Sequence, residues 1–229
     1  MLDLQVSAPQ GRSHHEALLF FRDLFERSRA LIGSFPLTRG PPEMDYISSV
    51  LQPVVAQKRL ESLFQVPGVM VAQDREDAGV FRPGDHVVGL NTVGMLLDRM
   101  SILAIKAWNL EHRSNLPDSA EQMERTQVAE LVQALADARP GHSSTNNKLT
   151  SHSMDAAAET FPSACYDLVT TNLLLWEAQE ILYNHDIAAL PSEELRRYIQ
   201  FFSKHNLARN VSIEAADRLY WTAIRSSLN

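Results

Sequence analysis

Hydrophobic residues recur along most of the chain at the three- and four-residue spacing that brings side chains onto one face of an α-helix. Ser13 and Glu16 form a capping box before the first such stretch, and Gly33 is placed to end it. A second stretch starts at Pro42 and contains Pro53, which should kink it. Helices are therefore predicted over residues 13–33, 42–64, 92–113, 119–139, 164–185 and 191–225.

Two stretches between these helices lack helical spacing. Residues 68–91 hold several glycines, a proline and two short β-prone pieces, so we expect a long irregular connection with room for one hairpin. Residues 139–153 are rich in Ser, Thr, Asn and His and predict a flexible surface loop.

Asp118 and Glu121 suggest a capping box for the fourth helix. The pattern predicts one all-α domain over residues 1–229, with N-terminal helices in 13–64 and a bundle core in 92–225, five to seven helices in total.

The last predicted helix carries polar residues inside its apolar seam. Asn206 and Arg209 stand where a packed helix usually has leucine, and His205 flanks them. Burial of an unpartnered amide costs about 1–3 kcal/mol, and burial of a charge costs more, so interior partners are expected. The seam consists of Leu195, Ile199, Phe202, Asn206, Arg209, Ile213, Ala216 and Tyr220.

The helix predicted over residues 164–185 has polar residues of its own. Asn172 and Gln179 lie seven residues apart and therefore share a face, with Trp176 beside them. Glu180 falls next to Trp176, whereas Glu177 faces away from this patch. The face predicts a second set of groups that need partners inside the bundle.

Asp98, on the helix predicted over residues 92–113, points between apolar residues, so its carboxylate either borders the core or lines a cleft. The planar guanidinium of arginine can grip a carboxylate with two parallel hydrogen bonds. We therefore expect Arg209 to pair with Asp98 or Glu180. The amides of Asn172, Gln179 and Asn206 would satisfy the polar atoms that remain.

Such a polar cluster has two interpretations, and the sequence leaves both open. In the first, the cluster is structural and fixes the register of the helices. In the second, it lines an internal pocket in which Arg209 and His205 meet an anionic or carbonyl group of a small ligand. Glu180 or Asp98 would then act as acid or base, because burial raises the pKa of a carboxyl group and makes it useful for proton transfer.

Composition excludes several classes of protein. The 229 residues are 45% hydrophobic, enough for a proper core, and the formal net charge is −7 without a basic stripe, which argues against nucleic acid as a partner. The start of the chain does not resemble a signal peptide and no apolar run is long enough for a membrane span, so we expect a cytoplasmic protein without membrane insertion. The single cysteine, Cys165, suits a reducing compartment.

Metal and cofactor chemistry has no support in the sequence. The eight histidines include no Glu-x-x-His spacing of a di-metal bundle, and Glu180 and His185 diverge around a helix. Glycine-rich nucleotide loops and the Gly-x-Ser-x-Gly elbow of serine hydrolases are absent. We expect neither a metal nor a cofactor.

Three stretches of the chain resemble a family of uncharacterised bacterial helical proteins, which are encoded beside, or fused to, glycosyltransferases of surface polysaccharide pathways. They are residues 93–106 (VGMLLDRMSILAIK), residues 172–183 (NLLLWEAQEILY) and residues 205–209 (HNLAR). The resemblance covers about residues 92–220 and leaves the N-terminal third aside. It implies kinship with that family, and through it a role in a biosynthetic pathway, but it supplies no reaction.

Two functions are compatible with these observations and stand as hypotheses. In the first, the polar cluster binds a small polar metabolite and carries out a metal-free acid/base step, with Asp98, Glu180 and His205 as catalytic groups. Ligand-binding residues would be Asn172, Trp176, Gln179, Asn206 and Arg209. In the second, the chain is a non-catalytic accessory protein of a glycosyltransferase or other biosynthetic enzyme, acting through a protein partner or as a homo-oligomer. An enclosed cavity at the cluster favours the first, and a dry, fully paired network favours the second.

Overall fold

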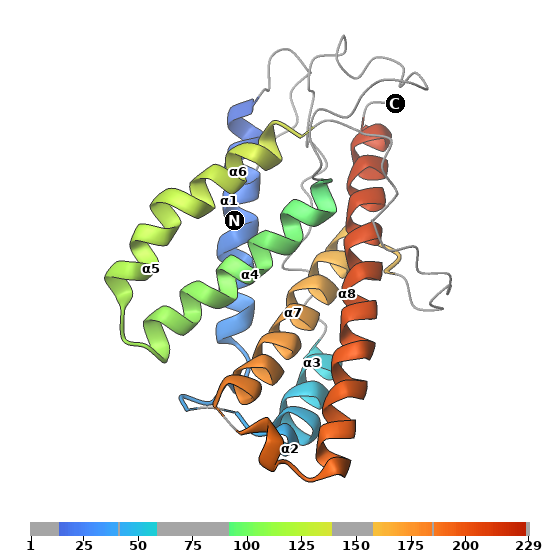
Figure 1. Cartoon of the computed structure of the whole chain (residues 1–229). Helices are drawn as coiled ribbons and strands as arrows, with labels where there is room; N and C mark the ends of the chain where they lie inside the picture. The colour runs from blue at the N-terminus through green and yellow to red at the C-terminus, as the bar shows by residue number, and fades with distance from the viewer. Residues whose placement is uncertain (1–13, 41, 59–91, 139–157, 185, 228–229) are drawn as a thin grey trace.

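The computed structural model describes residues 14–40, 42–58, 92–138, 158–184 and 186–227, and this part of the chain contains helices and no strand (Figure 1). The all-α class predicted from the sequence is confirmed. The predicted connection at 68–91, the predicted loop at 139–153 and the end of the second predicted helix lie outside the described residues. The elements are α1 (His14–Gly33), α2 (Met44–Tyr46), α3 (Gln52–Lys58), α4 (Val93–His112), α5 (Pro117–Met123), α6 (Ala129–Ala136), α7 (Phe161–Asn184) and α8 (Ser192–Ser227).

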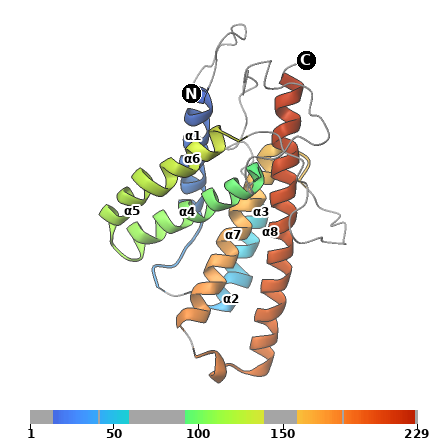
Figure 2. The same ribbon diagram turned by 45° about the horizontal axis from the view of Figure 1, so that its top comes forward.

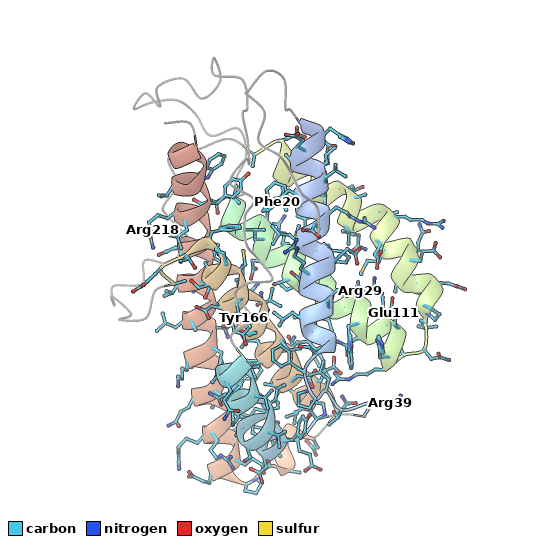
Figure 3. All side chains as sticks on the ribbon, turned by 180° about the vertical axis from the view of Figure 1, so that it is seen from behind. Phe20, Arg29, Arg39, Glu111, Tyr166 and Arg218 are labelled. Carbon is cyan, nitrogen blue, oxygen red and sulfur yellow. The ribbon has the colours of Figure 1, made fainter. Side chains whose placement is uncertain are left out.

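The centre of the bundle consists of α4, α7 and α8. The most extensive interface joins α7 to the 36-residue α8, which runs antiparallel to it, and α4 packs against both helices (Figures 1 and 2). Helix α1 covers α4 and α6 from the other side, and the segment Ile47–Leu51, between α2 and α3, contacts α7 (Figures 1 and 3). Within the described part, no helix combines the length and the apolar composition needed to cross a bilayer.

Helix α7 is buried on almost every side, since α1, α4, α8 and the segment after α2 all contact it. The hydroxyl of Tyr166 on α7 donates to the carbonyl of Val55 on α3 over 2.6 Å and ties α3 to this centre. Helix α1 is held differently, by an ion pair between Arg29 and Glu111 of α4 that Figure 3 shows from behind. Glu124 accepts a second hydrogen bond from Arg29, over 2.5 Å.

Two helices contain π-helical turns. The first lies just before Pro53, where residues Ile47–Leu51 wind as a π-helix in which the amide of Gln52 donates to the carbonyl of Ile47. Proline lacks an amide hydrogen, so a wider turn before it relieves the α-helical bonding that it cannot make. A second π-helical segment, Glu124–Val128, joins α5 to α6. The capping box predicted at Asp118 and Glu121 is wrong: Leu116 precedes the helix and Pro117 occupies its first turn.

The buried face of α8 differs from the predicted seam over its first half. Ile199 is 59% exposed, whereas Tyr198, Phe201 and His205 are buried. The true stripe is therefore rotated by one residue, about 100°, until Ile213 and Ala216 bring the predicted and observed faces together. Apolar residues occur on both faces of this stretch, so periodicity alone selects the wrong one.

Helices α4 and α8 approach each other closely at Gly94. A Cβ atom placed on this glycine would lie 2.0 Å from the carbonyl oxygen of Ile213 and 3.2 Å from Cβ of Asp217. Only glycine allows the two backbones to come so near. This contact sets the distance at which side chains of α4 and α8 meet one turn further along.

Candidate functional site

Asp98 of α4 and Arg209 of α8 form a bidentate ion pair. Nε of Arg209 donates to Oδ1 of Asp98 over 2.7 Å, and one terminal nitrogen donates to Oδ2 over 2.5 Å. The side chain of Asp98 is 8% exposed and that of Arg209 is 30% exposed. The hydrogen bond to Asp98 raises the pKa of Arg209 despite burial. The predicted pairing of Arg209 with Asp98 is confirmed, and the pair ties α8 to α4.

Asn172 of α7 completes this arrangement. Its amide nitrogen donates to Oδ1 of Asp98 over 2.8 Å and contacts Oγ of Ser101 at 2.6 Å. Ser101 in turn donates to the backbone carbonyl of Asp98. We call these four residues, Asp98, Ser101, Asn172 and Arg209, the Asp98 network. Its carboxylate accepts three hydrogen bonds from two other helices, so the charge is neutralised from within the bundle.

Other predicted members lie outside the Asp98 network. Gln179 is exposed and donates to the hydroxyl of Tyr183 over 2.5 Å, and Asn206 is exposed and donates to the carbonyl of Phe202 over 2.9 Å. The prediction that these two amides face the interior is wrong, and for Asn206 the reason is the one-residue rotation of the buried stripe. The half-buried Glu180 has no ion pair among the described side chains, so Arg209 pairs with Asp98 alone.

His205 and Trp176 occupy apolar surroundings. The His205 ring is buried, lies 3.9 Å from the Phe201 ring and has Nδ1 2.9 Å from the Phe201 carbonyl. Burial lowers the pKa of this imidazole, which favours the neutral form. Trp176 is half-buried, and its buried Nε1 has no hydrogen-bond partner within the described residues. Neither side chain donates to Asp98, whose hydrogen bonds come from Asn172 and Arg209.

A second buried ion pair, absent from the sequence predictions, joins Arg113 at the end of α4 to Glu177 of α7. One terminal nitrogen of Arg113 donates to Oε2 of Glu177 over 2.6 Å, another donates to Oδ1 of Asn109 over 2.9 Å, and Nε donates to the carbonyl of Thr38 over 2.9 Å. The guanidinium also lies 5.5 Å from the ring centre of Trp108. We call Thr38, Asn109, Arg113 and Glu177 the Glu177 network.

Glu177 is less well satisfied than Asp98. Its side chain is 0% exposed, and Oε1 is buried without a hydrogen-bond partner among the described atoms. Burial raises the pKa of Glu177, the bond and charge of Arg113 oppose that rise, and Glu180 adds to it. Burial also raises the pKa of Tyr46, and the negative charge of Glu177 raises it further. The Arg113 charge therefore offsets only part of the cost of burying this carboxyl group.

The sequence contains a weak signal of this second pair. Asn109 and Arg113 lie four residues apart at the end of a helix, on the side that faces α7. A helical wheel with one buried face assigns Glu177 to solvent. In a helix buried all round, such as α7, any charged side chain must find a partner inside.

The beginning of α4 has a third polar contact with α8. The hydroxyl of Thr92 accepts from the amide of Met95 over 3.2 Å, and Oδ1 of Asp217 accepts from the amide of Gly94 over 3.3 Å. Burial raises the pKa of Asp217, and the backbone amides of Gly94 and Val93 oppose this. A carboxylate at a helix N-terminus satisfies free amides and stabilises the helix, so Asp217 caps α4 from a neighbouring element.

A groove lies elsewhere, between α4 and the helix formed by Glu124–Val128 and α6. Its volume is about 410 Å³, and no residue of either network lines it. Leu96 and Leu131 are buried, and together with the half-buried Ile102 and Leu103 they form the apolar part of its lining. Its lining is Leu96, Arg99, Ile102, Leu103, Gln127, Glu130, Leu131 and Ala134.

Metal-ligating and nucleophilic groups do not gather in the described residues. There, no three His, Cys, Asp or Glu side chains come together in a way that could hold a metal ion. Cys165 is buried, and burial raises the pKa of its thiol, which disfavours the nucleophilic thiolate.

Comparison of the chain with protein-family models, curated proteins and solved structures found no match.

Proposed function

We propose that the chain is a non-catalytic accessory protein, a rigid helical frame that acts by binding a protein partner. The observation that carries this proposal is the closure of the Asp98 network. Both oxygens of Asp98 accept from Arg209, and Oδ1 also accepts from Asn172. A carboxylate held in this way is poorly placed to take a proton from a substrate, because a base must first release its own donors.

The remaining candidates for acid/base chemistry do not converge on this carboxylate. His205 stacks on Phe201, and Glu177 pairs with Arg113 on a different turn of α7. Interhelical ion pairs of this kind are best known for fixing register and orientation. The two networks and the Asp217 cap hold α4 to α7 and α8 at several points along its length, which gives a frame suited to presenting a fixed surface.

The partner is inferred to be a biosynthetic enzyme. The resemblance of residues 93–106 and 172–183 to helical proteins encoded beside glycosyltransferases supports a glycosyltransferase first. The direct test is to co-express the chain with the biosynthetic enzyme encoded next to its gene and to measure the mass of the purified species by light scattering. A defined complex between the two proteins is expected, and two separate species would refute the proposal.

The competing function is binding of a small polar metabolite at the Asp98 network. It requires a ligand that displaces Arg209 or Asn172 from Asp98, and the partial exposure of Arg209 is the feature that favours it. Native mass spectrometry of protein purified from its own host separates the two functions. A retained small molecule that is lost in Arg209→Met, while Arg218→Met on the exposed side of the same helix keeps it, would establish the metabolite function instead.

A further inference from the structure

We propose that the groove between α4 and α6 binds an amphipathic helix of the partner, with acidic residues along the edge that faces α4 and basic residues along the edge that faces α6. This inference rests on the proposed accessory function and names the surface and the chemistry of its partner. The groove lies on the α4 and α6 hairpin, whose two arms run side by side in Figures 1 and 2.

The first argument is the shape of the groove. Its α4 wall presents Leu96, Arg99 and Leu103, and its other wall presents Gln127, Leu131 and Ala134. Each wall therefore spans about two helical turns, at the spacing of residues that share one helical face. A helix with apolar side chains at positions i, i+3 or i+4, and i+7 matches two such walls.

The second argument is the charge of the two walls. Arg99 is exposed on α4, and Lys106, seven residues later, extends the same strip. Glu130 is exposed on the opposite wall beside Gln127. In the described structure neither Arg99 nor Glu130 makes an ion pair, although Arg22, Arg29 and most other described arginines do. One wall is thus basic and the other acidic, and both charges lie beside the apolar residues of the lining without an ion pair.

The charge pattern selects the occupant. A ligand of one charge would be attracted by one wall and repelled by the other, whereas a helix with opposite charges on its two edges is attracted by both. A second copy of this chain is a poorer candidate, because each copy carries a formal net charge of −7. The partner helix is therefore expected to come from a different protein.

The test uses three fluorescently labelled helical peptides, each about five turns long, with the same leucine stripe. The first has glutamates on one edge and lysines on the other, the second has glutamates on both edges, and the third has lysines on both. Fluorescence anisotropy with the full chain is expected to show the mixed peptide binding about tenfold more tightly than either of the others. Equal binding of all three, or no binding, would overturn the proposal.

Variants of the chain locate the site. Ala134→Trp fills the groove and is expected to weaken binding of the mixed peptide by about tenfold or more. Ala129→Trp, the same change at an exposed position of α6 that does not line the groove, should leave binding unchanged. Arg99→Glu makes both walls acidic and should shift the preference to the peptide with lysines on both edges. Equal effects of the two tryptophans, or an unchanged preference in Arg99→Glu, would refute the groove as the site.

Two further outcomes would show that a second copy occupies the groove or that the partner binds elsewhere on the chain. A concentration-dependent dimer of the chain that Ala134→Trp abolishes would assign the groove to a second copy and would overturn the proposal. A partner enzyme that binds the Ala134→Trp variant as tightly as the unmodified chain would overturn the groove while leaving the accessory function standing. The accessory function fails separately, in the co-expression test.

Discussion

The Asp98 and Glu177 networks each pair a carboxylate with an arginine, but α4 supplies the opposite partner in the two. In the first, α4 supplies the carboxylate and a neighbouring helix supplies the arginine, and in the second α4 supplies the arginine. Asp98 accepts three hydrogen bonds and its partner reaches solvent, whereas Glu177 accepts one and is wholly enclosed. The difference teaches that the number of donors around a buried carboxylate, and the exposure of its partner, decide how well its charge is held.

The largest expected effect comes from removing the arginine of the enclosed pair. Arg113→Met leaves Glu177 without its counter-charge and Thr38 without its donor, and should lower the free energy of unfolding by about 3–5 kcal/mol. Lys106→Met, an exposed position on the same helix, should change it by less than about 0.5 kcal/mol. Urea unfolding followed by circular dichroism measures both.

A second variant tests the reason for that loss. Arg113→Met combined with Glu177→Met replaces the pair by apolar side chains of similar size, and should recover much of the lost stability because the buried charge is gone. A double variant no more stable than Arg113→Met would show that the lost contacts of Arg113, rather than the stranded carboxylate, account for the effect.

The corresponding change in the other network should cost less. In Arg209→Met, Asp98 keeps the Asn172 donor, and water can reach the place of a guanidinium that was 30% exposed, so we expect a loss of about 2–3 kcal/mol. Arg218→Met, also on α8, is the exposed control and should be near neutral. If Arg209→Met destabilises the protein more than Arg113→Met, the comparison between the two networks is wrong.

The Gly94 contact allows one network to be disturbed without the other. Gly94→Ala places a methyl group against the carbonyl of Ile213 and should cost about 1–3 kcal/mol, although alanine otherwise favours a helix. Hydrogen exchange should rise at the start of α4 and in the facing turns of α8, but not around Arg113. Gly40→Ala, where nothing lies within 4 Å of the added atom, is the control.

The smallest effect is one of pH. Because the pKa of Glu177 is raised in the folded chain, there is a pH range in which the native state keeps this proton and the unfolded state has released it. The stability that this group contributes to the wild type falls as the pH rises through that range. Glu177→Gln removes the dependence. The stability of wild type relative to Glu177→Gln should therefore increase as the pH falls from 7 towards the usual glutamate value of about 4.3. An unchanged difference across that range would contradict the raised pKa, and Glu130→Gln controls for loss of an exposed carboxylate.

Periodicity predicted most of the fold, because amphipathic helices reveal their boundaries and their buried faces in the spacing of apolar residues. It also found Asp98 and Arg209, whose charges interrupt apolar seams on two helices, and their pairing followed from chemistry. The same method failed for Asn206, because α8 has apolar residues on two adjacent faces and only one of them is buried. Glu177 escaped because α7 is enclosed on all sides, and which neighbour lies opposite each residue depends on the packing of whole helices.

The π-helical turn at Ile47–Leu51 means that this segment contains one residue more than an α-helix of the same length would hold. Because the wide turn absorbs the extra residue, α3 keeps the rotational phase that an uninterrupted α-helix one residue shorter would give it. Deletion of a single residue within Ile47–Leu51 should therefore restore ordinary winding, keep Val55 in the core and leave its carbonyl within reach of the Tyr166 hydroxyl. The same deletion within α3 has no wide turn to absorb it and should turn the residues beyond it by about 100°.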